Sequence, residues 1–263
     1  MVMGIINVTP DSFHTQSRVQ TETEVKNTVE KFISEGADII DVGACSTRPG
    51  AQNVAADEEL YRLSHALETI RKYFPDVILS VDTYRAAVAK TAVNHFNVNI
   101  INDISGGDFD PSMFETVGTL SVPYVLTHSP KQFECLHQTA DTSEIIAEVL
   151  YDLGKKLRIL HELGVKDIFI DPGFGFGKTV EQNYTLLRNL EMFSFLHHPL
   201  LVGFSRKRMV TEVLNISANE ALNGTTYLNS VALEKGAAVL RVHDVAQAAE
   251  CVKLYSKLYL TKA

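Results

Sequence analysis

The stretch Val77-Ile78-Leu79-Ser80-Val81-Asp82 is a short apolar run that ends in a carboxylate, and runs of the same kind recur along the chain. The eight runs occupy residues 3–7, 39–43, 77–82, 99–103, 124–128, 168–171, 200–205 and 238–243. A run of about five or six mainly apolar residues, rich in β-branched side chains, is typical of a parallel strand buried on both faces. The sequence therefore predicts eight such strands.

Helical patterns fill the intervals between these runs. Leu60, Leu63 and Leu67 recur at helical spacing, and Thr21 followed by Glu24 has the form of a capping box at a helix start. The first and eighth runs end 236 positions apart, which gives about 34 residues for each strand–helix unit. This spacing predicts a single (β/α)8 TIM barrel that spans residues 1–263, with a doubly wound open sheet as the alternative.

The overall composition limits the partners. The 263 residues include 24 Lys and Arg against 32 Asp and Glu, a net charge of −8, whereas nucleic-acid-binding surfaces are basic. No apolar run reaches the roughly 20 residues needed to cross a bilayer, and the first residues lack the features of a signal peptide. Three widely spaced cysteines form neither a disulfide framework nor a zinc motif. We therefore expect a cytoplasmic protein that binds neither nucleic acid nor membranes.

Polar side chains stand at the carboxyl ends of the predicted strands, where TIM barrels hold their active sites. Asp82, Asn102 and Asp171 offer carboxylate and amide groups that suit a flat heterocycle with several N–H donors. Metal chelation is the competing interpretation. The sequence has no His-x-x-x-His pair or compact carboxylate cluster of the kind that builds a tight metal site.

Basic side chains reverse the acidic balance at the same strand ends. The set consists of Arg48, Lys178, Arg206, Lys207, Arg208, Arg241 and His243. Local positive charge on an acidic protein predicts an anionic ligand that is phosphorylated or carboxylated. Arg241 and His243 are two positions apart and therefore point to the same side of a strand. Lys178 and Arg206 also fit ordinary solvated surface charges.

The segment 173–179 (GFGFGKT) resembles the end of a phosphate-binding P-loop. That motif needs a glycine five positions before Gly177, and position 172 is a proline. The spacing therefore excludes a P-loop. We expect instead that the glycines let this segment turn over the barrel mouth and place Phe176 near a ligand.

Short motifs follow one another along the chain at residues 4–13 (GIINVTPDSF), 36–43 (GADIIDVG), 46–50 (STRPG), 80–83 (SVDT), 101–103 (IND), 171–176 (DPGFGF), 203–207 (GFSRK) and 241–244 (RVHD). In this order they cover essentially the whole chain. Together they resemble the motifs of the dihydropteroate synthase family of pterin-binding TIM barrels.

The resemblance implies an enzyme of folate biosynthesis. It would join 6-hydroxymethyl-7,8-dihydropterin pyrophosphate to p-aminobenzoate and release pyrophosphate and 7,8-dihydropteroate. The pterin would be held by Asp82, Asn102, Asp171 and Lys207. The pyrophosphate would be held by Asn7, Arg241 and His243, and Asn7 would also touch a Mg²⁺ cofactor. The aminobenzoate would lie beside Phe176, Ser205 and Lys207, together with Phe13 and Pro49.

Two loops of the family would close over the substrates. They carry Phe13 and, in the second loop, Thr47, Arg48 and Pro49. The residues implied to be catalytic are Asp82, Lys207, Arg241, His243, Thr47 and Arg48. The resemblance further implies a homodimer and a sulfonamide target.

The implied chemistry agrees with the residue types. An arylamine is uncharged at neutral pH and needs no strong base, so the difficult step is the expulsion of pyrophosphate. Arg241, His243 and Mg²⁺ would stabilise the negative charge that grows on this leaving group. Asp82 and Asp171 would stabilise positive charge on the pterin, which favours a dissociative substitution at its methylene carbon.

The chain departs from the family pattern at residues 14–18, 44–45 and 127–131, and Arg208 follows Lys207 where the family often has serine. Arg208 could therefore pair with the aminobenzoate carboxylate. Two other functions stay open: a pterin-binding methyltransferase domain with the same barrel, and a pterin-binding protein without catalysis. The methyltransferases do not need the segments 46–50 and 205–207, both of which are present here.

Overall fold

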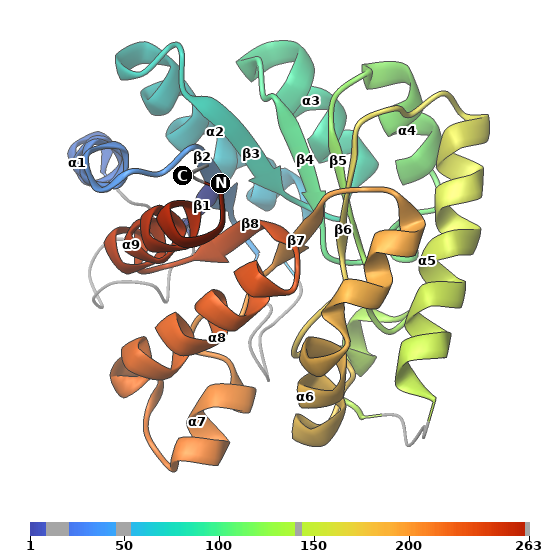
Figure 1. Ribbon diagram of the computed structural model, residues 1–263. Helices are drawn as coiled ribbons and strands as arrows, with labels where there is room; N and C mark the ends of the chain where they lie inside the picture. Colours follow the sequence, from blue (N-terminus) through green and yellow to red (C-terminus); the bar gives the residue numbers. More distant parts are fainter. Residues whose placement is uncertain (9–20, 46–53, 140–143, 261–263) are drawn as a thin grey trace.

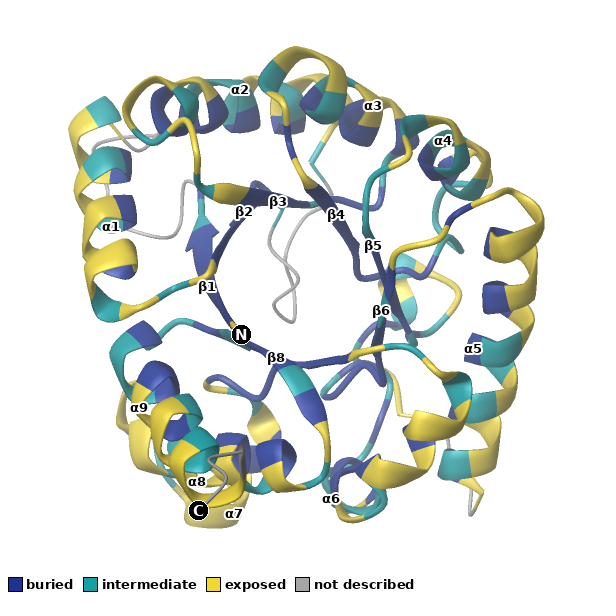
Figure 2. Ribbon diagram, turned by 45° about the horizontal axis from the view of Figure 1, so that its top comes forward, coloured by how far each residue is buried: buried dark blue, intermediate teal, exposed yellow. Residues whose placement is uncertain are grey.

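The computed structural model describes residues 1–8, 21–45, 54–139 and 144–260. Eight parallel strands pair in chain order, and β8 pairs with β1, so that the sheet closes into a barrel. Helices surround the ring of strands, with their buried faces toward it and their exposed faces outward (Figures 1 and 2). The expected (β/α)8 TIM barrel is confirmed, and the open doubly wound sheet is excluded.

The strands and helices alternate along the chain. The strands are β1 (Val2–Asn7), β2 (Ile39–Gly43), β3 (Ile78–Asp82), β4 (Ile100–Asp103), β5 (Tyr124–Thr127), β6 (Ile168–Asp171), β7 (Leu200–Val202) and β8 (Ala237–Val242). The α-helices are α1 (Glu22–Glu35), α2 (Ala56–Tyr73), α3 (Ala86–Phe96), α4 (Met113–Leu120), α5 (Ile145–Glu162), α6 (Val180–Arg188), α7 (Arg208–Leu214), α8 (Leu222–Glu234) and α9 (Val245–Tyr255). None of the helices in the described ranges is long and apolar enough to span a membrane.

Local sequence determines where helix α1 begins and ends. The Thr21 side chain accepts a hydrogen bond from the Glu24 backbone, and the Glu24 carboxylate accepts one from the Thr21 backbone. This capping box, expected from the sequence, satisfies two N–H groups at the start of the helix. Gly36 ends the helix with φ of +99°, a left-handed conformation that a side chain would strain.

Three strands end earlier than the sequence predicts, and the run 124–128 is a strand only as far as Thr127. The run 200–205 is a strand only as far as Val202, because the chain then turns and Arg206 has φ of +60°. Ser205 therefore lies on a loop. The run 238–243 starts one residue earlier and stops at Val242, so His243 follows the strand. Both residues still lie at the carboxyl end of the barrel.

An apolar layer fills the interior of the barrel. It is formed by Met3, Ile39, Ile100, Val125, Leu201 and Val239, each from a different strand. Because side chains two positions apart point to the same face of a strand, the next inward position on each of these strands lies one layer nearer the barrel mouth. Those positions are Ile5, Asp41, Asn102, Thr127 and Arg241, together with Gly203 directly after β7. Polar groups thus begin directly above the apolar layer.

Asp103, the last residue of β4, has a buried carboxylate that holds the loop that follows this strand. Asp103 accepts hydrogen bonds from the Tyr124 hydroxyl at 2.6 Å, the Ser105 backbone at 2.8 Å and the Gly107 backbone at 2.9 Å. Burial raises the pKa of Asp103, and the hydrogen bonds from Tyr124 and Ser105 oppose that rise. The interactions tie β4 to β5 beside the mouth.

We predict that Tyr124→Phe lowers the free energy of unfolding by about 2 kcal/mol, because the buried carboxylate of Asp103 loses a donor. Urea denaturation of the wild type and the variant measures this difference. Tyr227→Phe, which changes an exposed tyrosine, is the matched control and should leave stability unchanged. Equal stability of Tyr124→Phe and the wild type would contradict this role of the hydroxyl.

Candidate active site

A cavity of about 770 Å³ opens at the carboxyl ends of the strands. Nine of the site residues expected from the sequence line it, namely Asn7, Asp82, Asn102, Asp171, Phe176, Ser205, Lys207, Arg241 and His243. The other four, Phe13, Thr47, Arg48 and Pro49, lie outside the described residues. The structure therefore brings together every expected residue that it describes.

Arg241 joins three strands across the mouth. Its guanidinium donates to Asp41 on β2 at 2.7 Å and to Asp82 on β3 at 2.5 Å. The amide of Asn102 donates to the same Asp41 oxygen at 3.0 Å. Asp41 is fully buried, and its other carboxylate oxygen has no hydrogen-bond partner among the described residues. Two residues expected to hold different parts of the substrate, Asp82 and Arg241, are thus paired with each other.

The charges in this cluster perturb one another. Burial, together with the neighbouring Asp41, raises the pKa of Asp82 to about 7, although Arg241 opposes that rise. Burial lowers the pKa of Arg241, but the two carboxylates outweigh it and the net shift is upward. Arg241 therefore stays charged, and the two carboxylates share a single positive partner within the cluster.

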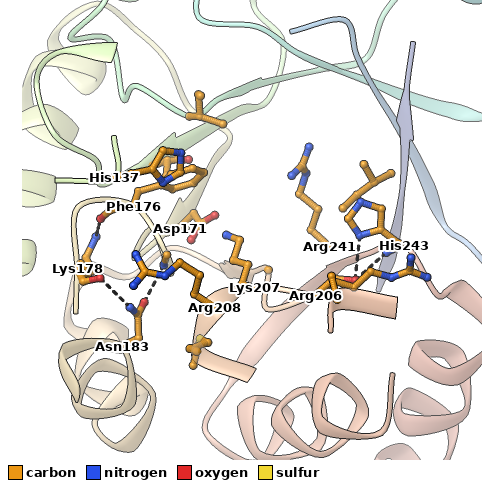
Figure 3. A pocket seen from close by; sticks show the side chains of 18 of the residues that line it. His137, Asp171, Phe176, Lys178, Asn183, Arg206, Lys207, Arg208, Arg241 and His243 are labelled. Carbon is orange, nitrogen blue, oxygen red and sulfur yellow. Dashed lines mark hydrogen bonds between the residues drawn. The ribbon is translucent and has the colours of Figure 1, made fainter. Parts of the chain in front are cut away.

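Lys207 lies between the acidic and the basic parts of the cavity (Figure 3). Its ammonium donates to the Phe174 carbonyl at 2.5 Å and lies 4.6 Å from the centre of the Phe176 ring. Burial lowers the pKa of Lys207 to about 8, and the attraction of Asp171 opposes this shift. A cation beside a ring face is stabilised by the ring's electrons. Lys207 is thus placed to contact both an aromatic ligand and an anion.

The loop between β6 and α6 forms another wall. The Gly173 backbone donates to Asp171 at 2.7 Å, and the Gly175 backbone donates to the Asn183 side chain at 2.7 Å. Burial raises the pKa of Asp171, while Lys207 opposes the rise. As expected, the glycines turn the segment over the mouth and place Phe176 on the cavity.

The sequence also allows Lys178 to be an ordinary solvated surface charge. The structure shows a different environment. The Lys178 side chain is buried, and its ammonium donates to main-chain carbonyls of the same loop. That interpretation of Lys178 was therefore wrong. Arg206, in contrast, is exposed and pairs with Asp244 at 2.8 Å, as expected of a surface charge.

Ser205 and His243 meet at the end of β8. The Nδ1 atom of His243 lies 2.9 Å from the Ser205 hydroxyl, which also accepts a hydrogen bond from the His243 backbone at 3.3 Å. The hydroxyl fixes the orientation of the imidazole (Figure 3). Together with Arg241, His243 gives this side of the cavity two nitrogen-bearing side chains suited to an anion.

Sequence reasoning missed several members of the site. Asp41 lies within the run 39–43, yet nothing in the sequence pairs it with Arg241, 200 positions away. Asn183 and Thr127 line the cavity. The alternation of inward positions along β2 and β5 could have indicated that Asp41 and Thr127 face the barrel interior.

Comparison with known proteins agrees with this geometry. The family model described as "Pterin binding enzyme" matches residues 3–243. A dihydropteroate synthase of Bacillus subtilis is 39% identical over 256 residues, which cover 97% of this chain and 87% of that protein. The chain belongs to the dihydropteroate synthase family.

Solved structures of this family superpose closely on the barrel. The Yersinia pestis dihydropteroate synthase with a sulfonamide drug has a TM-score of 0.91 and 34% identity, covering 99% of this chain and 94% of that one. The Xanthomonas albilineans enzyme in complex with 7,8-dihydropteroate has a TM-score of 0.87 and 31% identity, with coverage of 99% and 94%. The protein is thus a pterin-binding transferase of folate biosynthesis, and the cavity at its barrel mouth is the candidate active site.

We predict that Arg241→Met destabilises the fold by about 3–5 kcal/mol at pH 8, because Asp41 and Asp82 lose their shared partner. Without the guanidinium, burial holds the pKa of Asp82 in the folded state still further above its unfolded value. Asp82 in the folded variant then takes up a proton as the pH falls. The loss of unfolding free energy caused by the substitution should therefore be smaller at pH 5 than at pH 8.

Urea denaturation of wild type and variant at both pH values measures this dependence. Arg158→Met, which changes an exposed arginine on α5, is the control and should behave as the wild type does. A penalty that is the same at pH 5 and pH 8, or larger at pH 5, would contradict the proposed electrostatics.

Proposed function

We propose that the protein joins 6-hydroxymethyl-7,8-dihydropterin pyrophosphate to p-aminobenzoate. The bond between the pterin methylene carbon and the pyrophosphate oxygen breaks, and a bond from that carbon to the amine nitrogen forms. The amine loses one proton, and the products are 7,8-dihydropteroate and pyrophosphate. The observation that carries this proposal is a single cavity that contains an acid–amide group (Asp82, Asn102 and Asp171) and a cationic group (Arg241, His243 and Lys207). Arg241 joins the two groups because it pairs with Asp82.

The pterin would bind to the acid–amide group. Asp82, Asn102 and Asp171 offer two carboxylates and an amide to a heterocycle whose edge carries N–H donors and ring nitrogens. A buried site that hydrogen-bonds such an edge discriminates strongly against ligands that lack it. The 7,8-dihydropteroate bound to the Xanthomonas albilineans enzyme contains this heterocycle and supports the assignment.

The pyrophosphate would bind at β8 and β1. Arg241 and His243 are two positions apart and line the same cavity, and so does Asn7 at the end of β1. When the substrate enters, its heterocycle competes for Asp82 and its pyrophosphate competes for Arg241. The ion pair seen between these two residues would then be replaced by contacts of each with the substrate.

Mg²⁺ fits this site as an ion that accompanies the pyrophosphate. No cluster of three or more His, Cys, Asp or Glu side chains suited to a metal occurs in residues 1–8, 21–45, 54–139 and 144–260. Mg²⁺ is commonly held by one or two protein oxygens together with phosphate oxygens and water, and Asn7 offers one such oxygen. When bound, the ion would neutralise charge on the leaving group.

The substitution would be dissociative. Asp82 and Asp171 would stabilise positive charge on the pterin as the carbon–oxygen bond lengthens, and Arg241 and His243 would stabilise the departing anion. The enzyme needs no strong base, because the uncharged arylamine already has a free electron pair. Its proton would leave only after the carbon–nitrogen bond has formed.

The aminobenzoate would lie on the side of Phe176, Ser205 and Lys207. Arg208 also lines the cavity and pairs with Glu212 at 2.6 Å on the exposed side of α7. Its guanidinium would leave Glu212 to meet the aminobenzoate carboxylate. Sulfonamides resemble p-aminobenzoate, and the Yersinia pestis structure holds one. We therefore propose that sulfonamides compete at this side. The expected homodimer and cytoplasmic location stay predictions.

We predict that purified protein forms dihydropteroate from the pterin pyrophosphate, p-aminobenzoate and Mg²⁺. Lys207→Ala and Arg241→Ala should each lower turnover at least about tenfold, because each removes a charged hydrogen bond within the cavity. Circular dichroism checks that both variants fold, and Arg158→Ala serves as a distant control.

Near-normal turnover in either variant would contradict the proposed site. Pterin binding without product in the wild type would instead favour a binding protein without catalysis. Transfer of a methyl group in place of the condensation would favour the methyltransferase alternative.

We also predict that removal of Mg²⁺ abolishes the reaction. Treatment with EDTA followed by gel filtration should lower turnover at least about tenfold, and added Mg²⁺ should restore it, because the leaving group loses a counter-charge. Binding of the pterin alone, measured by calorimetry, should change little. Full turnover after chelation would contradict the role of the ion.

A further inference from the structure

Lys178 is a buried cation that the proposed chemistry does not use. Its ammonium donates to the carbonyl oxygens of Gly173 at 2.9 Å, Phe176 at 3.0 Å and His128 at 3.3 Å. A protonated lysine has three N–H donors, so these three contacts use all of them. Within the described part of the chain, none of its hydrogen bonds goes to a carboxylate.

The loop that Lys178 holds has little rigidity of its own. Gly173, Gly175 and Gly177 all have positive φ, at +73°, +82° and +62°. Glycine adopts many conformations in an unfolded or loose segment, so a fixed shape needs bonds from outside. A Cβ atom on Gly173 would lie 1.7 Å from the His128 carbonyl oxygen, which shows how closely the loop approaches the end of β5.

Lys178 connects the two ends of this loop to β5. Two of its contacts, to Gly173 and Phe176, span the loop, and the third reaches His128 directly after the strand. Asn183 on α6 ties the middle of the loop through the Gly175 backbone. The ammonium is thus the point at which both ends of the loop and the neighbouring strand end meet.

The same loop fixes the position of Lys207. The Phe174 carbonyl accepts the hydrogen bond of the Lys207 ammonium, and the Phe176 ring lies 4.6 Å from that ammonium. Gly175 packs against the Lys207 stem so closely that an added Cβ would lie 3.0 Å from its Cδ. A shift of the loop would therefore move Lys207 and Phe176 together.

We propose that Lys178 is a positioning residue, whose ammonium sets the shape of the loop 173–177 and through it the placement of Lys207 and Phe176 for the aminobenzoate. This inference rests on the proposed function of the cavity. Burial lowers the pKa of Lys178 to about 7, although the attraction of Asp171 opposes the shift, so the interior makes the charged form costly to keep.

Lys178→Met tests the proposal, because it keeps an unbranched apolar stem and removes only the ammonium. We expect hydrogen–deuterium exchange of the loop amides to become at least about tenfold faster, since the loop loses charge-assisted hydrogen bonds. We expect kcat/KM for p-aminobenzoate to fall at least about tenfold. Exchange in the barrel strands should not change.

Lys156→Met is the matched control. Lys156 is also buried, but it pairs with Asp108 at 2.7 Å and Asp152 at 3.1 Å. Within the described residues, none of its ion pairs reaches the loop 173–177. We expect this variant to melt at a lower temperature, with kinetic constants and loop exchange within about twofold of the wild type. A general effect of losing a buried lysine would appear in both variants.

Chemical rescue separates the role of the ammonium from packing. In Lys178→Ala, propylammonium replaces the missing atoms of the side chain and should restore kcat/KM at least about threefold. 1-Propanol has a similar size but no charge and should not restore it. Restoration of slow exchange in the loop by propylammonium would confirm that the cation fixes the loop.

Unchanged loop exchange and unchanged kcat/KM in folded Lys178→Met would overturn the inference. Faster exchange throughout the barrel, without rescue by propylammonium, would also overturn it in favour of a merely structural residue. A wild type that makes no dihydropteroate would overturn the proposed function instead. The exchange measurement would then still decide whether Lys178 fixes the loop.

Discussion

Two carboxylates share one guanidinium at the mouth of the barrel, and the arrangement of the site depends on this interaction. Asp41 and Asp82 come from neighbouring strands, and Arg241 comes from the strand that closes the barrel. Such buried ionic clusters are costly to form because their charges lose water. They are retained where geometry or function requires them, and here the cluster aligns three strand ends above an apolar layer.

In the proposed function, this constraint lets one cavity serve two kinds of ligand group. The acid–amide side offers Asp82, Asn102 and Asp171, and the cationic side offers Arg241, His243 and Lys207. Asp82, Asp171, Arg241 and Lys207 each have a hydrogen-bond partner within the protein, so a substrate that matches both sides would exchange contacts rather than create unpaired charges. In the proposed function, the acidic chain would bind the pyrophosphate through these few buried cations.

The barrel and most of the described site could be predicted from sequence. Buried strands appear as short apolar runs, and the last residues of each run reach the mouth because parallel strands end at the same edge. Asp82 and Asp171 illustrate this rule, since each is the last residue of its run. The family motifs added the roles of these residues.

Other features depend on contacts that a linear pattern does not contain. Lys178 follows a glycine-rich segment, and only the folded path of that segment turns its side chain inward. The pairing of Asp41 with Arg241 joins residues 200 positions apart. The early end of β7, which leaves Ser205 on a loop beside His243, follows from a turn at Arg206 that no propensity indicates.

In the proposed function, the cluster separates when the substrate binds, with the pterin on one side and the pyrophosphate on the other. A crystal structure of the protein with the pterin pyrophosphate and Mg²⁺ would reveal this separation. We expect the heterocycle against Asp82, Asn102 and Asp171, with the pyrophosphate on Arg241 and His243. An intact Asp82–Arg241 pair, with the pyrophosphate bound beside Lys178 and Arg208 instead, would contradict it.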